Sequence, residues 1–95
     1  MARAARSENG ARLVDVELEL VDESRNAFRY YAIEVRRTLF ERSLVITHGR
    51  IGARLVVVEE RFDSDRELAR RYDELLAKRR RHGYVPSKRR RRATR

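Results

Sequence analysis

The side chains of this chain that could do chemistry are mostly cations, and they gather in three places. His48-Gly49-Arg50 lies between two apolar runs, Lys78–Arg81 is a run of four basic residues, and Lys88–Arg92 is a run of five. Arginine presents a planar fork of donors to phosphate oxygens, and glycine lets a ligand approach the backbone closely. These residue types therefore indicate contact with a phosphate-bearing polyanion.

Catalysis is poorly supported, because it needs a nucleophile, a base beside it and a group that orients the base. The chain has no cysteine, and its two histidines, His48 and His82, have no evident serine or aspartate partners. Glu59 and Glu60 alternate across an expected strand, so their carboxylates do not converge. No metal-ligand spacing and no Walker or dinucleotide-binding glycine loop is present. We therefore expect no catalytic residue, no metal, no cofactor and no small-molecule substrate.

The positive charge of the chain is concentrated after residue 77. The 95 residues carry a formal net charge of +9. Residues 13–77 hold eleven arginines against fourteen acidic residues, whereas residues 78–95 hold ten basic residues and no acidic one. A mildly acidic body with a basic extension is common among nucleic-acid-binding proteins. The run Lys88, Arg89, Arg90, Arg91 and Arg92 should contact phosphates without reading sequence.

Plainer interpretations of the same residues stay open. Cations in the last turn of a helix complement its dipole, and a basic run also keeps a protein soluble or binds acidic proteins. His48-Gly49-Arg50 is also what an ordinary hairpin turn would contain. The four residues Lys78, Arg79, Arg80 and Arg81 point around a helix, so they cannot all serve one surface. We expect the stem of Arg79 to lie on the core face.

Alternating apolar and polar residues, together with shorter apolar runs, predict four strands. They cover residues 13–21, 27–36, 43–48 and 54–62. Gly49 and Gly52 should bracket the turn between the last two strands. Because every connection is short, we expect an antiparallel meander.

The hydrophobic period then changes to that of a helix, which we place at residues 64–82. Ser64 and Glu67 form a capping box, and Gly83 and Pro86 end the segment. Its apolar stripe consists of Leu68, Tyr72, Leu75 and Leu76. Burying that stripe on the sheet gives an α+β domain of two layers, an antiparallel sheet of about four strands with one C-terminal amphipathic helix. The chain then divides into a flexible arm at 1–12, a domain at 13–86 and a disordered basic tail at 87–95.

Neither a secretory signal nor a membrane span is evident. The N-terminus is charged but has no apolar stretch, and no run approaches the roughly 18 apolar residues that a spanning helix needs. We therefore expect a soluble, cytoplasmic protein with no membrane partner. It would be associated with the nucleoid if it binds DNA.

Five short motifs follow one another along the predicted domain. They are Phe28-Arg29-Tyr30-Tyr31, Ser43-Leu44-Val45, His48-Gly49-Arg50-Ile51-Gly52, Phe62-Asp63-Ser64 and Lys78-Arg79-Arg80-Arg81-His82-Gly83-Tyr84. In this order and spacing they resemble the WGR domain, a family named for a Trp-Gly-Arg signature. That family occurs as a module in poly(ADP-ribose) polymerases and as small bacterial proteins. The resemblance spans Leu13–Tyr84.

The resemblance implies a twisted antiparallel sheet with one helix packed on it, and DNA binding near ends or strand breaks. In the polymerases, the signature tryptophan stacks at the DNA end and the signature arginine lies in the same interface. Carried over to this chain, the three positions are His48, Gly49 and Arg50, with histidine in place of tryptophan. The Gly-Gln that often follows the signature is Leu55-Val56 here. The resemblance concerns this module and implies no ADP-ribosyl transfer.

We therefore predict a non-catalytic module that binds nucleic acid, foremost double-stranded DNA, through backbone contacts without sequence specificity. The expected contacts of the body are His48, Gly49, Arg50, Arg54, Lys78, Arg79, Arg80 and Arg81, joined by the tail residues Lys88–Arg92. The alternative is a protein-interaction adaptor, in which the acidic strand face of Asp15, Glu17 and Glu19 docks a partner protein. In that case the tail is an auxiliary polyanion contact. A small RNA-associated protein held by charge alone is a third hypothesis.

Overall fold

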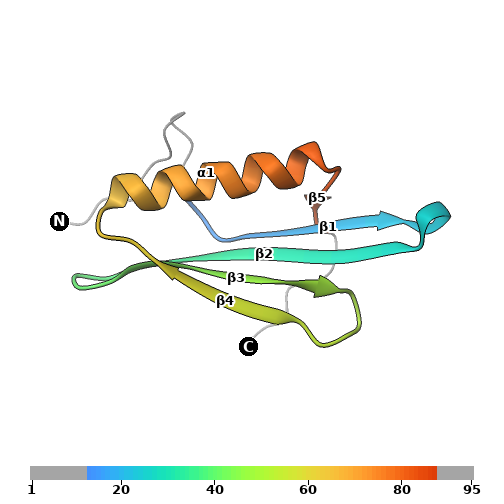
Figure 1. The fold of residues 1–95 in the computed structure, drawn as a ribbon, viewed down its shortest axis with the longest axis horizontal. Coiled ribbons are helices and arrows are strands. Elements are labelled where there is room, and N and C mark those ends of the chain that lie inside the picture. Colours follow the sequence, from blue (N-terminus) through green and yellow to red (C-terminus); the bar gives the residue numbers. More distant parts are fainter. Residues whose placement is uncertain (1–12, 88–95) are drawn as a thin grey trace.

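The computed structural model describes residues 13–87, and it places one helix on one face of an antiparallel sheet (Figure 1). The elements in chain order are β1 (Val16–Asp22), the short 3-10 helix η1 (Glu23–Arg25), β2 (Ala27–Arg37), β3 (Arg42–Arg50), β4 (Val56–Arg61), α1 (Asp65–Arg81) and β5 (Val85–Pro86). The strand order is β4-β3-β2-β1-β5. The expected α+β class is confirmed.

The sheet has five strands, one more than the meander predicted from the sequence. The added strand, β5, pairs antiparallel with β1, with Pro86 opposite Leu18 and Val85 opposite Glu19. A strand of two residues shows no alternation, and the sequence pattern indicates Pro86 only as part of the helix stop. Ser87 continues the pairing, because its N–H donates to the Glu17 carbonyl at 2.9 Å.

The turn between β3 and β4 begins later than expected. Gly49 lies inside β3, opposite Tyr30, so it does not open the turn. Its φ is +151°, and a Cβ added there would lie 3.0 Å from Cδ2 of Leu55. Gly52, in the turn itself, has a φ of +87° with open space around it. Position 49 therefore favours glycine mainly through its backbone conformation, and the Leu55 side chain would have to shift slightly to admit a Cβ.

Helix α1 begins and ends close to the predicted residues. The Ser64 Oγ accepts a hydrogen bond from the Glu67 N–H at 3.1 Å, as an N-cap does. The Glu67 carboxylate accepts from the N–H of Asp63 at 3.3 Å, one residue before the partner expected in a capping box. At the other end, Gly83 has a φ of +97°, and the Tyr84 N–H donates to the Arg79 carbonyl at 3.0 Å. This left-handed residue ends the helix.

The core lies between α1 and the three central strands. It comprises Leu13, Leu18, Tyr31, Ile33, Leu44, Ile46, Leu68, Ala69, Tyr72, Leu75, Leu76 and Tyr84. All four residues of the predicted apolar stripe are among them. Fully burying one such side chain contributes about 1.5–3 kcal/mol to folding. Strand β4 adds nothing to this buried cluster, and its three valines, Val56, Val57 and Val58, are 41–63% exposed.

The opposite side of the sheet carries no helix within residues 13–87 (Figure 1). The strand register places alternate residues there, and we call this side the open face. Its residues include Asp15, Glu17, Glu19, Tyr30, Ala32, Glu34, Arg36, Val45, Thr47, Val57, Glu59 and Arg61. The acidic strand face predicted from the sequence is part of it.

Candidate nucleic-acid interface

The C-terminal end of α1 and the turn between β3 and β4 lie at the same end of the molecule (Figure 1). Most body residues predicted to contact nucleic acid therefore come to one end. We call it the basic end, and its members are His48, Gly49, Arg50, Arg54, Lys78 and Arg79. In the register, His48 lies opposite Tyr31 of β2, on the sheet face that α1 covers.

Arg79 is the best-fixed cation of the basic end. Its guanidinium carbon lies 4.3 Å from the centre of the Tyr31 ring and 5.7 Å from that of Tyr84. Cation–π contacts of this kind contribute about 0.5–2 kcal/mol, depending on their exposure to water. The stem of Arg79 lies on the core, as predicted, and its Nε is buried without a hydrogen-bond partner. The guanidinium is therefore held in one place before any ligand arrives.

Tyr31 connects Arg79 to His48. Its side chain is 2% exposed, and its ring centre lies 6.4 Å from that of His48. Burial raises the pKa of the Tyr31 hydroxyl above its usual value, against the lowering effect of Arg79. Tyr31 therefore stays neutral and acts as a support between the two side chains. His48 itself is exposed at the surface.

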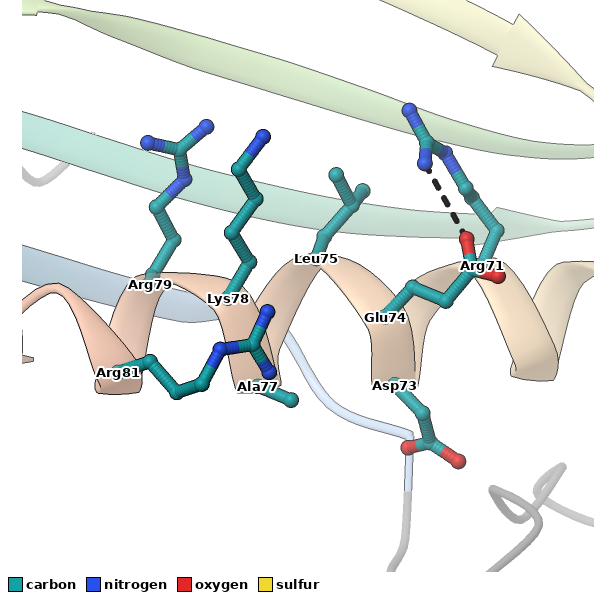
Figure 2. A pocket seen from close by; sticks show the side chains of 8 residues that line it. All are labelled: Arg71, Asp73, Glu74, Leu75, Ala77, Lys78, Arg79 and Arg81. Atoms are coloured by element: carbon teal, nitrogen blue, oxygen red, sulfur yellow. Dashed lines mark hydrogen bonds and ion pairs between the residues drawn. The ribbon is translucent and has the colours of Figure 1, made fainter.

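A hollow of about 170 Å³ lies between α1 and strands β3 and β4, beside these side chains. Its lining residues are Tyr31, Ile46, His48, Val58, Glu60, Arg71, Leu75 and Arg79. Figure 2 shows Arg71, Leu75, Lys78 and Arg79 along one flank of α1, directed toward the sheet. A wider groove of about 580 Å³ continues along this helix and shares Arg71, Leu75 and Arg79 with the hollow.

Arg71 is a site residue that the sequence analysis missed, although it lies eight positions before Arg79 on the same flank. Its Nε and Nη2 donate to the two oxygens of Glu60 at 2.8 and 3.1 Å, and its Nη1 donates to Glu74 at 3.2 Å. The hydrogen bonds to Glu60 raise the pKa of Arg71 further above its usual value. Its charge is shared with two carboxylates, so Arg71 ties α1 to β4. Helical spacing from Arg79 was the signal that could have found it.

The profile of the WGR domain family matches residues 14–91 of the chain. The chain belongs to the WGR domain family. It is also 34% identical, over 70 residues, to an uncharacterized protein named y4dW from Sinorhizobium fredii (strain NBRC 101917 / NGR234). The aligned part is 73% of this chain and 34% of that relative, so the chain spans about a third of the relative's length. No solved structure gave a significant match.

In this WGR domain Arg50, the residue expected at the signature arginine position, lies apart from the Arg79 stack. The Nη1 and Nη2 atoms of Arg50 donate to the main-chain and side-chain oxygens of Asn26, each at 3.3 Å. Its guanidinium carbon also lies 5.2 Å from the centre of the Phe28 ring. Arg50 is therefore anchored to the β1–β2 connection, where it remains exposed. Arg54 is exposed in the turn that follows β3.

The four consecutive cations of the WGR domain separate, as the sequence predicted. Lys78 and Arg79 point toward the sheet, whereas Arg81 is directed away from them (Figure 2). Arg80 is exposed, and its charge acts on Tyr72 on the other flank of the helix. Lys78 and Arg79 are therefore the members of this run that belong to the basic end. The predicted contacts Lys88–Arg92 lie outside the residues that the structure describes.

Residues 13–87 show neither a candidate metal site nor a helix that could span a membrane. No group of three or more His, Cys, Asp or Glu side chains in that range is placed to hold a metal ion. None of the helices in the same range has the length and apolar character needed to cross a membrane.

Proposed function

We propose that this WGR domain is a non-catalytic module that binds double-stranded DNA through its sugar–phosphate backbone. The observation that carries the proposal is the stack of Arg79 on Tyr31 beside the exposed His48. Arg79 provides a preorganised hydrogen-bond donor for phosphate oxygens, and His48 provides a ring that can stack on a sugar or base. Contacts to phosphates fix orientation on a duplex but carry no sequence information. The proposed binding is therefore independent of sequence.

The proposed domain prefers the open ends of a duplex to closed duplex. A base or sugar at the end of a duplex is open on one face, and stacking on an aromatic side chain contributes about 1–3 kcal/mol per base. His48 offers the smallest aromatic ring, so its contribution lies at the low end. Lys78 and Arg79 are then placed for the phosphates nearest that end, and Arg50 and Arg54 for phosphates further along.

The architecture favours backbone contact over reading of bases. Direct reading requires a helix or a strand ribbon inserted in the major groove. The apolar side of α1 is buried on the sheet, and its Arg71 is already bonded to Glu60 and Glu74. The cations of the last turn also offset the negative end of the helix dipole, which alone would repel phosphate.

The proposal is tested by fluorescence anisotropy with the full chain, using a blunt-ended duplex and a closed dumbbell duplex of equal length. The open-ended duplex should bind more tightly. His48→Ala and Arg50→Ala should each weaken that binding by at least about 3-fold, the equivalent of roughly 0.6 kcal/mol. Arg66→Ala, which removes an exposed arginine at the far end of α1, is the matched control and should change little. Equal losses in all three variants would refute the proposed site.

A protein-interaction adaptor remains the second candidate function, and one observation favours it. Leu39 and Phe40, in the turn between β2 and β3, are 84% and 91% exposed. Large apolar side chains at a protruding turn are suited to insertion in a partner protein. A photo-crosslinking residue at position 40 tests this role, since an adaptor should give a protein adduct in cells. A duplex RNA probe in the anisotropy experiment tests the RNA hypothesis.

A further inference from the structure

The open face of the sheet is distinctly acidic. Its carboxylates come from three strands and from the residue before β1, and they are Asp15, Glu17, Glu19, Glu34 and Glu59. The basic residues of this face are Arg36, which pairs with Glu34 at 3.1 Å, and Arg61, which pairs with Glu59 at 3.7 Å. Negative charge therefore predominates, and this side of the domain repels a polyanion.

The open face also has a groove of about 320 Å³. Its lining residues are Asp15, Val16, Glu17, Tyr30, Ala32, Ile33, Glu34 and Val45. Carboxylates thus stand beside the apolar surface of Tyr30, Ala32 and Val45. A surface of this kind suits arginine and lysine side chains, whose aliphatic stems cover apolar area while their charged ends reach polar partners.

The pairing of β5 with β1 brings the chain, at Ser87, to Glu17, which lines this groove. Pro86 lies opposite Leu18, and the Ser87 N–H donates to the Glu17 carbonyl at 2.9 Å. The Ser87 Oγ donates to Glu19 at 3.3 Å, on the open face. Directly opposed residues of an antiparallel pair share a face. If the same register continued by two residues, position 89 would fall opposite Asp15, on the open face.

We propose that the basic segment Lys88–Arg92 docks in the open-face groove of its own chain. In this arrangement the arginine ends pair with Asp15, Glu17 and Glu34, and their stems lie on Tyr30 and Ala32. Single surface ion pairs are weak. The segment begins one residue after Ser87, however, and short tethers give effective concentrations in the millimolar range. Because of this tether, several weak ion pairs are sufficient to hold the segment in the groove.

The docked segment would regulate DNA binding, a consequence that rests on the proposed function. Its cations cannot contact the open face and a duplex at the basic end at once. DNA must therefore compete with the domain's own carboxylates for them. Salt weakens both contacts, because the screening length falls from about 10 Å at 0.1 M to about 3 Å at 1 M.

The docking itself is tested without nucleic acid. The chain has no cysteine, so a nitroxide can be attached at Thr94→Cys in the full-length chain. Methyl NMR signals of Ala32 and Val45, on the open face, should lose more than half their intensity at low salt. Those of Leu68 and Leu76, in the helix, should lose much less, and all should recover at about 1 M salt. Equal broadening on both sides of the sheet would overturn the proposal.

A mixed sample separates docking within one chain from exchange between two. Spin-labelled, isotopically unlabelled chain is combined with isotope-labelled chain that carries no nitroxide. Intramolecular docking predicts no broadening of Ala32 or Val45 in this mixture. Broadening there would mean that the segment occupies a second copy, and it would overturn the proposal as stated.

A charge-matched pair of variants completes the test. Glu17→Gln/Glu34→Gln should abolish the broadening, whereas Glu23→Gln/Glu67→Gln, which removes equal charge elsewhere and keeps the capping acceptor, should preserve it. The first variant should also bind the duplex at least about 3-fold more tightly than the second, because the segment is released. Docking without this gain in affinity would overturn the regulatory role. If the segment docks but no variant binds DNA, the proposed function is refuted and the docking proposal stands.

Discussion

His48, which the motif order leads us to expect at the position of the family's tryptophan, is exposed beside Tyr31 and Arg79. A larger ring at this position should stack better on a DNA end. Since aromatic stacking contributes about 1–3 kcal/mol per base, His48→Trp should tighten binding to a blunt duplex by roughly 3- to 10-fold. Anisotropy against the closed dumbbell provides the control, because its ends are covered. An equal gain on both probes would show that His48 does not meet DNA ends.

Arg79 also stabilises the folded domain through its contact with Tyr31. Arg79→Ala removes both the cation–π contact and the packing of the stem, so the free energy of unfolding should fall by about 1–2 kcal/mol. Lys78→Ala removes the neighbouring, exposed cation and should change it by less than about 0.5 kcal/mol. Urea unfolding measures both values. Similar losses in the two variants would mean that the stack contributes little.

At the scale of elements, Asp65 joins the start of α1 to the β2–β3 hairpin. Its carboxylate accepts from Arg37 at 3.3 Å and from Arg42 at 2.9 Å. Partial burial opposes ionisation, but the bonds from Arg37 and Arg42 outweigh it and hold the pKa of the Asp65 carboxyl below its usual value. The ionised carboxylate therefore stabilises the fold at neutral pH.

The pH dependence of this contact has a definite sign. A carboxyl whose pKa is lowered by folding stabilises the protein above its unfolded pKa of 3.8, and the contribution is lost as the pH falls further. Asp65→Asn should therefore be less stable than the parent at pH 7, by about 0.5 kcal/mol since the pair is half-exposed. The difference should vanish near pH 2. Thermal unfolding at both pH values measures it, and a difference that persists at pH 2 would contradict this origin.

Strong local signals made most elements predictable. Ser64 and the stripe from Leu68 to Leu76 located α1, and alternation located β1 and β2. Strand β5 was missed because Val85 and Pro86 are ordered by pairing with β1, a long-range contact that no local pattern reports. Gly49 was misplaced for a related reason, since its pairing with Tyr30 keeps it in β3.

At the scale of the whole molecule, the two charge signs occupy different surfaces. Cations collect at the basic end, and carboxylates predominate on the open face. The sequence predicted the cationic residues and the acidic face of Asp15, Glu17 and Glu19. It did not predict that Glu34 and Glu59 join that face, because register decides which face a strand residue takes. The helix likewise separates Arg79 from Arg81, which are two positions apart.

The gathering of cations at the basic end predicts how DNA binding depends on salt concentration. A duplex held at the basic end and by the tail should meet about six phosphates, so log K against log salt should have a slope of about −5. Anisotropy titrations over several salt concentrations give this slope. A slope close to zero would exclude a backbone-binding module.

The most direct test of the central claim is NMR mapping of the full chain with a short blunt-ended duplex. Amide signals of Gly49, Arg50, Gly52 and the last turn of α1 should shift on titration. Signals of Ala32 and Val45, on the open face, should shift only to the extent that residues 88–92 leave the groove. Shifts confined to the open face, or none at all within residues 13–87, would exclude DNA binding at the basic end.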